Sequence, residues 1–327
     1  MKILVTGGCG FIGSHVVDAY IDAGHEVIVV DKNKKNINKK AEYVILDLTG
    51  NNHNNQNCSI EELFEKNKFD VVNHHAAQVS APFSLQDPIE DSEVNTVVTV
   101  KLLELCRKHD VKKFIFSSSA AVYGNPNKLP IIEETQCVPI SPYGLSKKIA
   151  EEYVRLYGEL YGIQYTIFRY ANAYGPRQSS SKESCVISVF VKNAVCNDDI
   201  VLFGDGLQTR DFVYVKDIVN ANLVVLDNNV VNSINCRLNN NDNNMHNNII
   251  NISSNRAVSI KELAEEVKNI TKSSSEIINK EERKGDIRHS VLDNAKMKKL
   301  FELKTTSLHE GLKETVLWYK QRGCRNE

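Results

Sequence analysis

A glycine-rich turn near the N-terminus constrains the fold more than any other feature of the sequence. The β-branched run 2–6 leads directly into TGGCGFIG (6–13), and apolar residues at helical spacing follow. Glycines at intervals of three permit a tight turn, let the backbone approach a pyrophosphate and let the helix pack closely on the strand. The helix N-terminus offers free N–H groups and the positive end of its dipole to phosphates. We therefore predict a dinucleotide site whose contacts here are Gly7, Gly10, Phe11, Ile12 and Gly13.

Strand-like and helix-like segments alternate through the first half of the chain. We predict strands at 2–6, 26–31, 43–46, 71–74, 114–118 and 165–170, and helices at 13–23, 60–67, 90–108 and 143–161. This alternation predicts an α/β fold with a doubly wound parallel sheet of the Rossmann type. Beyond residue 175 the pattern is less regular, with helices near 259–270 and 307–320. We expect a dinucleotide-binding domain at 1–174 and a smaller, partly interleaved α/β substrate domain at 175–327.

Two asparagine-rich tracts, 51–57 and 239–248, interrupt this pattern. Such polar segments cannot bury enough apolar surface to order themselves, so we predict mobile surface loops. The eight cysteines include no C-x-x-C pair. This spacing argues against a zinc site and a disulfide framework, and we expect reduced, mostly buried thiols.

The charge and hydropathy of the chain exclude several classes of function. A net charge of −1 provides no long-range field for nucleic acid or an acidic membrane. The N-terminus lacks the long apolar segment of a signal peptide, and no apolar stretch reaches the ~18 residues of a membrane span. We expect a cytoplasmic protein that binds a small molecule, without nucleic acid, membrane or metal.

Asp31 ends the second predicted strand, 18 residues after Gly13 (31 − 13 = 18). A carboxylate at this point accepts hydrogen bonds from the adenosine ribose and repels a 2′-phosphate, which favours NAD over NADP. The neighbouring Lys32, Lys34 and Lys35 could instead hold a phosphate, although a solvated basic loop is the simpler interpretation. Asp47 and Leu48 follow the third strand, where they either contact the adenine edge or form a strand-end turn.

Tyr143 and Lys147 form the second strong signal, because side chains at i and i+4 share one helix face. A phenol with a pKa of about 10 is a poor base at neutral pH. A neighbouring ammonium and a positively charged nicotinamide ring would favour the phenolate. An exposed Tyr/Lys pair is the alternative. It is disfavoured because the serine cluster 117–119 ends the preceding strand, where Ser119 can bond a reacting hydroxyl.

Seven ordered motifs give the chain a family resemblance. They are TGGCGFIG (6–13), HAAQ (75–78), FSSSAAVYG (116–124), SPYGLSK (141–147), FRYANAYGPRQ (168–178), GDGLQTRDFVYVKD (204–217) and RKGDIR (283–288). The chain resembles extended short-chain dehydrogenases/reductases of the NAD-dependent epimerase/dehydratase family, and among them the UDP-glucose 4-epimerases. The resemblance covers nearly the whole chain except the asparagine-rich tracts.

The resemblance implies roles for individual residues. Tyr143 would be the general base and acid, Lys147 would hold the nicotinamide ribose, and Ser119 would bind the sugar 4-hydroxyl. Further contacts to the cofactor, NAD, would come from Ala76, Ala77, Gln78, Asn95 and Tyr170. The UDP-sugar would meet Asn172 and Arg210 at its diphosphate, while Arg283, Asp286 and Arg288 would close over the nucleotide. A surface salt bridge is the competing interpretation for each arginine.

Ser290 resembles the family position that borders the sugar pocket, where a bulky aromatic residue excludes an N-acetyl group. A small side chain there would admit N-acetylated sugars, unless His289 or Arg288 fills the space in a different register. The resembling family also pairs two helices of each subunit in a four-helix bundle. We expect such a homodimer because apolar residues exceed what one sheet face can cover. They are Leu103, Leu105, Tyr153, Leu156, Tyr157 and Leu160.

Ala120 and Ala121 distinguish between sister reactions. Related dehydratases carry an Asp-Glu pair after the Ser/Thr, and related decarboxylases carry a Glu, whereas this chain has two alanines. Elimination would therefore lack its proton-transfer groups. We predict epimerisation at carbon 4 of UDP-glucose or UDP-galactose, with tightly bound NAD. A reductase that releases NADH, another nucleotide-sugar enzyme such as a dehydratase, and a non-catalytic dinucleotide-binding protein remain alternatives.

Overall fold

The computed structural model describes residues 1–50, 59–180, 185–226, 247–282, 287–301 and 304–324. Its centre is a seven-stranded parallel sheet in the order β10-β6-β5-β4-β1-β2-β3. The strands are β1 (Lys2–Thr6), β2 (Glu26–Asp31), β3 (Glu42–Ile45), β4 (Val71–His74), β5 (Lys113–Ser119), β6 (Gln164–Tyr170) and β10 (Asn248–Ile252). The predicted Rossmann-type sheet is confirmed, and the six strands expected from the sequence all form within one or two residues.

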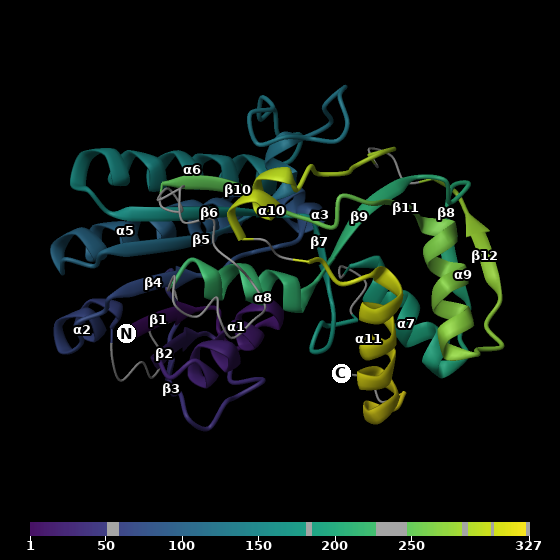
Figure 1. Cartoon of the computed structure of the whole chain (residues 1–327), viewed down its shortest axis with the longest axis horizontal. Coiled ribbons are helices and arrows are strands. Elements are labelled where there is room, and N and C mark those ends of the chain that lie inside the picture. The colour runs from purple at the N-terminus through teal and green to yellow at the C-terminus, as the bar shows by residue number, and fades with distance from the viewer. Residues whose placement is uncertain (51–58, 181–184, 227–246, 283–286, 302–303, 325–327) are drawn as a thin grey trace.

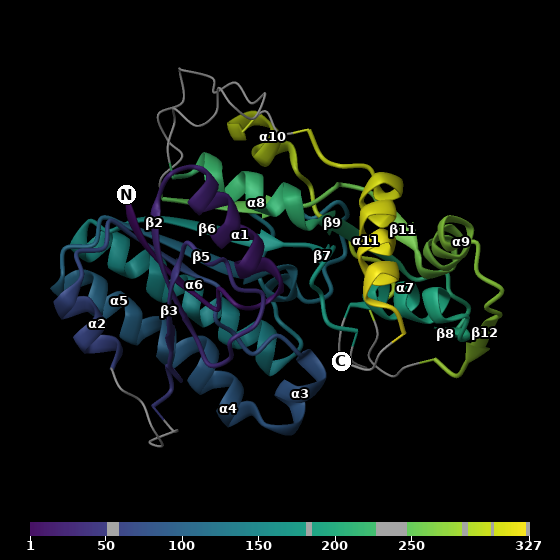
Figure 2. The ribbon, with the colours of Figure 1, turned by 90° about the horizontal axis from the view of Figure 1, so that it is seen from below.

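Helices cover both faces of this sheet (Figures 1 and 2). One face carries α1 (Phe11–Asp22) and α8 (Val215–Val224) over a core that includes Ile3, Val5 and Ile115. The other carries α2 (Ile60–Lys66), α5 (Val98–Lys108) and α6 (Pro142–Tyr161). The even-numbered residues Leu4, Phe114 and Phe116 pack there. Alternate residues of one strand thus fill two cores, because successive side chains point to opposite faces.

The helix predicted at 90–108 is interrupted. The structure has α3 (Ala81–Gln86), α4 (Pro88–Ser92), a π-helical turn at Glu93–Val97 and then α5. Asn95 lies in the π-helical turn, where it is fully buried. Its side chain accepts a hydrogen bond from the Gln78 amide (3.1 Å) and donates to the Gln78 carbonyl (3.0 Å). A single amphipathic helix was therefore too simple a prediction here, and π-helical turns are frequent at functional sites.

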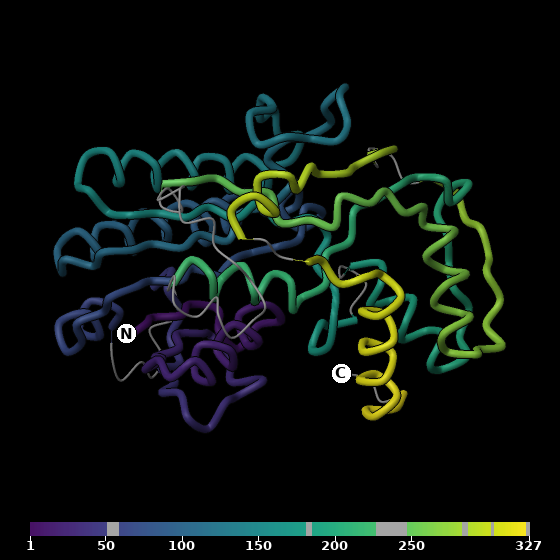
Figure 3. The backbone as a smooth tube through the Cα atoms, viewed as in Figure 1, coloured from purple at the N-terminus to yellow at the C-terminus, as the bar shows by residue number. Residues whose placement is uncertain are grey.

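A second group of elements lies beside the sheet (Figure 3). It holds a three-stranded sheet of β7 (Asn172–Tyr174), β9 (Thr209–Tyr214) and β11 (Ala257–Ser259), and a pair of β8 (Ile200–Phe203) with β12 (Ile277–Lys280). The helices α7 (Val186–Cys196), α9 (Ile260–Thr271) and α11 (Leu308–Arg322) pack around a core of their own, while α10 (Ala295–Phe301) packs near β10. The sequence indicated only α9 and α11 in this half of the chain.

The chain beyond residue 174 contributes to both groups, because α8 and β10 return to the large sheet. The division of domains at residue 174 stays a prediction. The loop predicted at 239–248 extends one residue too far, because Asn248 already begins β10 and pairs with Thr166. The remainder of that tract, apart from Asn247, and all of 51–57 lie outside the described residues.

Two further expectations are corrected. Cys196 and Cys324 form a disulfide, although we expected reduced thiols. They end α7 and follow α11, and the packing of these helices brings their Cα atoms within 5.5 Å across 128 positions. Leu103, Leu105 and Tyr157 are buried within the monomer, so they are not surplus apolar surface. No helix among the described residues is long and apolar enough to cross a bilayer.

Candidate active site

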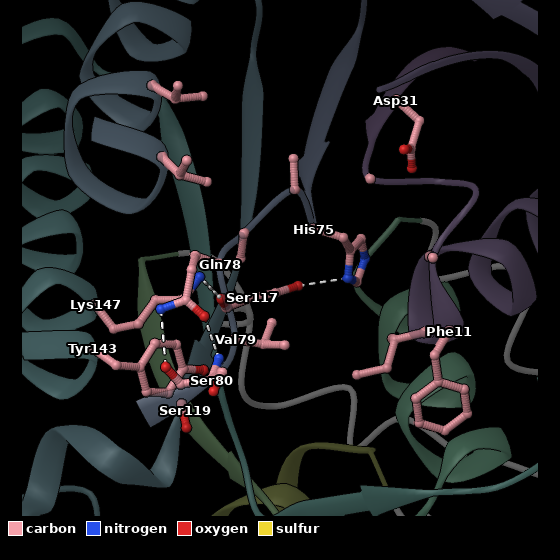
Figure 4. A pocket seen from close by; sticks show the side chains of 18 of the residues that line it. Phe11, Asp31, His75, Gln78, Val79, Ser80, Ser117, Ser119, Tyr143 and Lys147 are labelled. Carbon is pink, nitrogen blue, oxygen red and sulfur yellow. Dashed lines mark hydrogen bonds between the residues drawn. The ribbon is translucent and has the colours of Figure 1, made fainter. Parts of the chain in front are cut away.

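A cavity of about 1220 Å³ lies where β1, β4, β5 and β6 end. The carboxyl ends of parallel strands are the usual ligand site in a doubly wound sheet. Figure 4 shows Tyr143, Lys147 and Ser119 at one end of this cavity and Asp31 at the other. The predicted residues that line it are Gly7, Gly10, Phe11, Ile12, Gly13, Asp31, Asp47, Leu48, Ala76, Ala77, Gln78, Ser119, Tyr143, Lys147, Tyr170 and Asn172.

The glycine turn forms part of the cavity wall from bare backbone. Gly7 has φ of +68°, and a methyl group on it would lie 2.5 Å from the Ala76 nitrogen. A methyl group on Gly13 would collide with the Gly7 carbonyl oxygen. The glycines are therefore required by packing, and they leave a cradle that an added Cβ would fill. The structure thus supplies the close backbone approach that a pyrophosphate needs.

Asp31 is tied to the glycine turn. The backbone amide of Cys9 donates to Asp31 Oδ2 at 3.0 Å, and that of Asn33 donates to Oδ1 at 3.0 Å. These bonds fix the orientation of the carboxylate at the end of β2. Each ionised oxygen accepts more than one hydrogen bond, so both keep lone pairs for ribose hydroxyls.

The helix α6 brings the predicted catalytic side chains into the cavity. Ser141 caps the helix, Pro142 starts it, and the Tyr143 amide donates to Ser84 Oγ at 3.0 Å. Burial raises the Tyr143 pKa, the neighbouring Ser119 side chain opposes this increase, and nearby Asp91 adds to it. The Lys147 Nζ donates to the Ser117 carbonyl, and the expectation that Lys147 and a positively charged nicotinamide ring together favour the phenolate stays a prediction.

Lys147 is 3% exposed, and its Nζ donates to the Ser117 carbonyl at 3.0 Å. The ammonium also lies 4.9 Å from the centre of the Phe116 ring. Burial lowers the Lys147 pKa to about 8, against the opposing charges of Asp91 and Glu151. The side chain is therefore still mainly an ammonium ion at neutral pH.

Sequence reasoning missed an ion pair behind the serine cluster. Glu151 is 1% exposed and pairs with Arg169 at 2.6 Å. Ser118 Oγ donates to the same carboxylate at 2.5 Å. Glu151 follows Lys147 by four residues, so helical spacing could have revealed it. Spacing along the chain gave no signal for Arg169, because it lies on β6 and comes near the site only when the sheet forms.

His75 is another cavity residue without a predicted role. Its Nδ1 lies 2.7 Å from Ser117 Oγ, and Figure 4 shows this bond between the two side chains. Burial and the charge of Lys147 lower the His75 pKa to about 3. The imidazole is thus neutral at physiological pH and adds no charge to the site.

The predicted substrate residues are less concentrated. Asn172 lines the cavity, and its side chain donates to the Asp211 carbonyl at 3.0 Å. Arg210 donates to the Thr209 carbonyl, and Arg288 forms an exposed, two-pronged ion pair with Asp205. These two arginines and Ser290 do not line the cavity among the described residues. Arg283 and Asp286 lie outside the described residues.

Comparisons with known proteins agree with this geometry. The model of the NAD dependent epimerase/dehydratase family matches residues 3–239. A relative from Methanocaldococcus jannaschii with the name "Putative UDP-glucose 4-epimerase" is 41% identical over 97% of this chain and 98% of that protein.

Solved structures extend the likeness to the whole fold. A UDP-glucose 4-epimerase from Thermotoga maritima, crystallised with UDP-glucose, is 37% identical and superimposes with a TM-score of 0.88 over 98% of this chain and 99% of that one. A UDP-N-acetylglucosamine 4-epimerase from Methanobrevibacter ruminantium has a TM-score of 0.85 at 32% identity, with 98% of each chain covered.

Proposed function

The chain belongs to the NAD dependent epimerase/dehydratase family, and we propose that it inverts carbon 4 of a UDP-sugar by transient oxidation. The observation that carries this proposal is the group Ser119, Tyr143 and Lys147 at one end of a cavity that begins at the glycine turn. The bare backbone of Gly7 and Gly13 fits the pyrophosphate of NAD. UDP-sugar 4-epimerases are also among the solved and curated proteins that resemble the chain along its whole length.

The proposed chemistry divides between cofactor and protein. NAD, when bound, accepts and returns a hydride. Tyr143 takes the proton of the 4-hydroxyl through its phenol oxygen and later gives it back to the sugar oxygen. Ser119, which lines the same end of the cavity as Tyr143, orients that hydroxyl. Burial raises the Tyr143 pKa and so opposes phenolate formation, whereas the positive charge of oxidised NAD, when bound, would favour the phenolate.

Ala120 and Ala121 favour epimerisation over elimination or decarboxylation. They begin the short 3-10 helix Ala120–Tyr123, and the Ala121 amide donates to Ser119 Oγ at 3.2 Å. The positions next to Ser119 therefore carry methyl groups and a capping bond, with no acid for a second proton transfer. Oxidation, rotation of the keto sugar and reduction require only Ser119, Tyr143 and Lys147 with NAD.

We also propose that the sugar site admits a 2-acetamido group. Ser290 does not line the described cavity, so the proposal rests on the family resemblance, in which this small residue stands at the position that borders the sugar. Its backbone amide donates to the Thr209 carbonyl at 3.1 Å, which fixes its register beside β9. His289 and Arg288, the side chains that would fill the space in a different register, bond to other residues. His289 bonds Thr209 Oγ1 at 3.0 Å, and Arg288 pairs with Asp205.

A homodimer belongs to the same proposal. An apolar stripe runs along α6 at helical spacing, with exposures from 37% at Tyr153 to 61% at Leu160. Its members are Leu145, Ile149, Tyr153, Leu156 and Leu160. Burying this stripe against its symmetry mate, with α5 packed beside α6 in each subunit, would form the four-helix bundle expected from the family resemblance. Light scattering at micromolar protein tests it, and a monomer would contradict it.

The substitution Tyr143→Phe tests the function itself. It removes the proton carrier and leaves the glycine turn intact, so we expect NAD to stay bound while turnover falls by at least about a thousandfold. NMR of the anomeric protons of UDP-glucose, UDP-galactose and their N-acetyl analogues measures the turnover. Activity of the variant near that of the wild type would contradict the proposed mechanism. Steady release of NADH by the wild type would indicate a dehydrogenase instead.

A further inference from the structure

Asp91 is a buried carboxylate that the proposed reaction does not use. It lies on α4 with 0% exposure. Its Oδ1 accepts from Gln78 Nε2 at 2.7 Å and from Asn95 Nδ2 at 3.0 Å. Its Oδ2 has no hydrogen-bond partner. Within the described part of the chain, no lysine or arginine forms an ion pair with it.

Such a carboxylate is costly to retain. A charge removed from water without a paired cation costs several kcal/mol, and two neutral amide donors return only part of this. Glu151, the other buried acid near the site, has a bidentate bond from Arg169. Asp91 therefore needs a compensating charge from a different source.

The position of Asp91 identifies Lys147 as that source. The helix α4 and the π-helical turn pack against α6. Asn95, which donates to Asp91 Oδ1, also donates to Ser146 Oγ at 3.2 Å, and Ser146 precedes Lys147 on α6. Burial lowers the Lys147 pKa, and the charge of Asp91 opposes that change. The other titratable groups that interact with the ammonium are Glu151 on α6, His74 at the end of β4 and His75 directly after it. Both imidazoles are buried and neutral, and the charge of Glu151 is already balanced by Arg169.

We propose that Asp91 is a positioning residue, a buried counter-charge that keeps Lys147 in its ammonium form and in place beside the cofactor ribose. The inference rests on the proposed function, because that function places Lys147 at the ribose. Gln78 completes the arrangement: it lines the cavity and binds Asp91, so the counter-charge lies one hydrogen bond behind the cavity wall.

The substitution Asp91→Asn tests the proposal with little change of shape. Its amide oxygen can still accept from Gln78 and Asn95, while the negative charge is lost. In holoenzyme carrying lysine labelled with 13C at Cε, with the Lys147 signal identified by Lys147→Met, the titration of the wild-type signal gives the reference midpoint. In Asp91→Asn the midpoint should fall by about one pH unit. Glu65→Gln, which removes one exposed carboxylate from α2, should leave the midpoint unchanged.

Activity provides the second measurement. With Asp91 gone, both limbs of the pH profile of kcat/KM should move to lower pH, because the Asp91 charge raises the pKa of Tyr143 as well as that of Lys147. A purely structural role would lower the whole profile without moving it. An unchanged Lys147 midpoint in Asp91→Asn overturns the proposal, and Asp91→Ser provides the same test if the first variant does not fold. If the wild type proves inactive but Asp91→Asn still shifts the Lys147 midpoint, the proposed function is overturned and the role of Asp91 as a counter-charge stands.

Discussion

Replacing Lys147 by methionine should stabilise the protein while it impairs catalysis. Burial lowers the pKa of this lysine from 10.5 to about 8. Each unit of pKa corresponds to about 1.4 kcal/mol, so the buried ammonium costs about 3 kcal/mol of folding free energy at pH 7. Methionine has a similar length and no charge. It loses the bond to the Ser117 carbonyl, worth about 1 kcal/mol.

The sign of the effect depends on pH. Because the folded protein disfavours the ammonium, the cost is fully present below pH 8 and disappears as pH rises toward 10.5. The methionine variant should therefore be more stable than wild type by about 2 kcal/mol at pH 7, and this advantage should shrink by about 1 kcal/mol at pH 9.

Urea denaturation of nucleotide-free protein at pH 7, 8 and 9 measures both quantities, since bound NAD would add its own stabilisation. Lys148→Met is the matched control. Its Nζ also donates to a backbone carbonyl, that of Cys137 at 3.0 Å, and its removal takes away no buried charge. A difference between wild type and Lys147→Met that stays constant from pH 7 to 9 would refute the reasoning.

Two other substitutions test the cofactor site and the sugar site separately. Asp31→Ala should reduce the preference for NAD over NADP by about tenfold or more, because it removes ribose acceptors and the repulsion of a 2′-phosphate. Equal discrimination by both proteins in a binding titration would exclude that role. Ser290→Tyr should suppress turnover of UDP-N-acetylglucosamine selectively and spare UDP-glucose. An equal loss with both substrates, or no N-acetyl activity in the parent, would show that Ser290 does not border the 2-substituent.

Local patterns predicted much of the site. The glycine turn, the strand ends and the Tyr143/Lys147 pair each depend on residues within one turn of chain, so spacing alone reveals them. The cavity joins Gly7, Ser119 and Tyr143 as expected, because parallel strands place their carboxyl ends along one edge.

Long-range contacts explain what the sequence did not predict. The strand β10 follows an asparagine-rich tract and pairs with β6 from more than 80 positions away. Its identity as a sheet strand depends on that partner. Asp91 looks like a surface acid in a polar segment, and only the π-helical turn and α6 make it buried. The disulfide likewise depends on how α7 and α11 pack.

The buried charges behind the cavity form a neutral set, with Lys147 and Arg169 balanced by Asp91 and Glu151. If Asp91 compensates Lys147, the two substitutions cannot be independent. Asp91→Asn alone should destabilise the protein by about 1 kcal/mol, because it leaves the buried ammonium uncompensated. In the Lys147→Met background the same change removes a carboxylate that has lost its cation, so it should be neutral or stabilising. A double-mutant cycle in urea at pH 7 should then give a coupling of at least about 1 kcal/mol, and additive effects would show that the two charges do not interact.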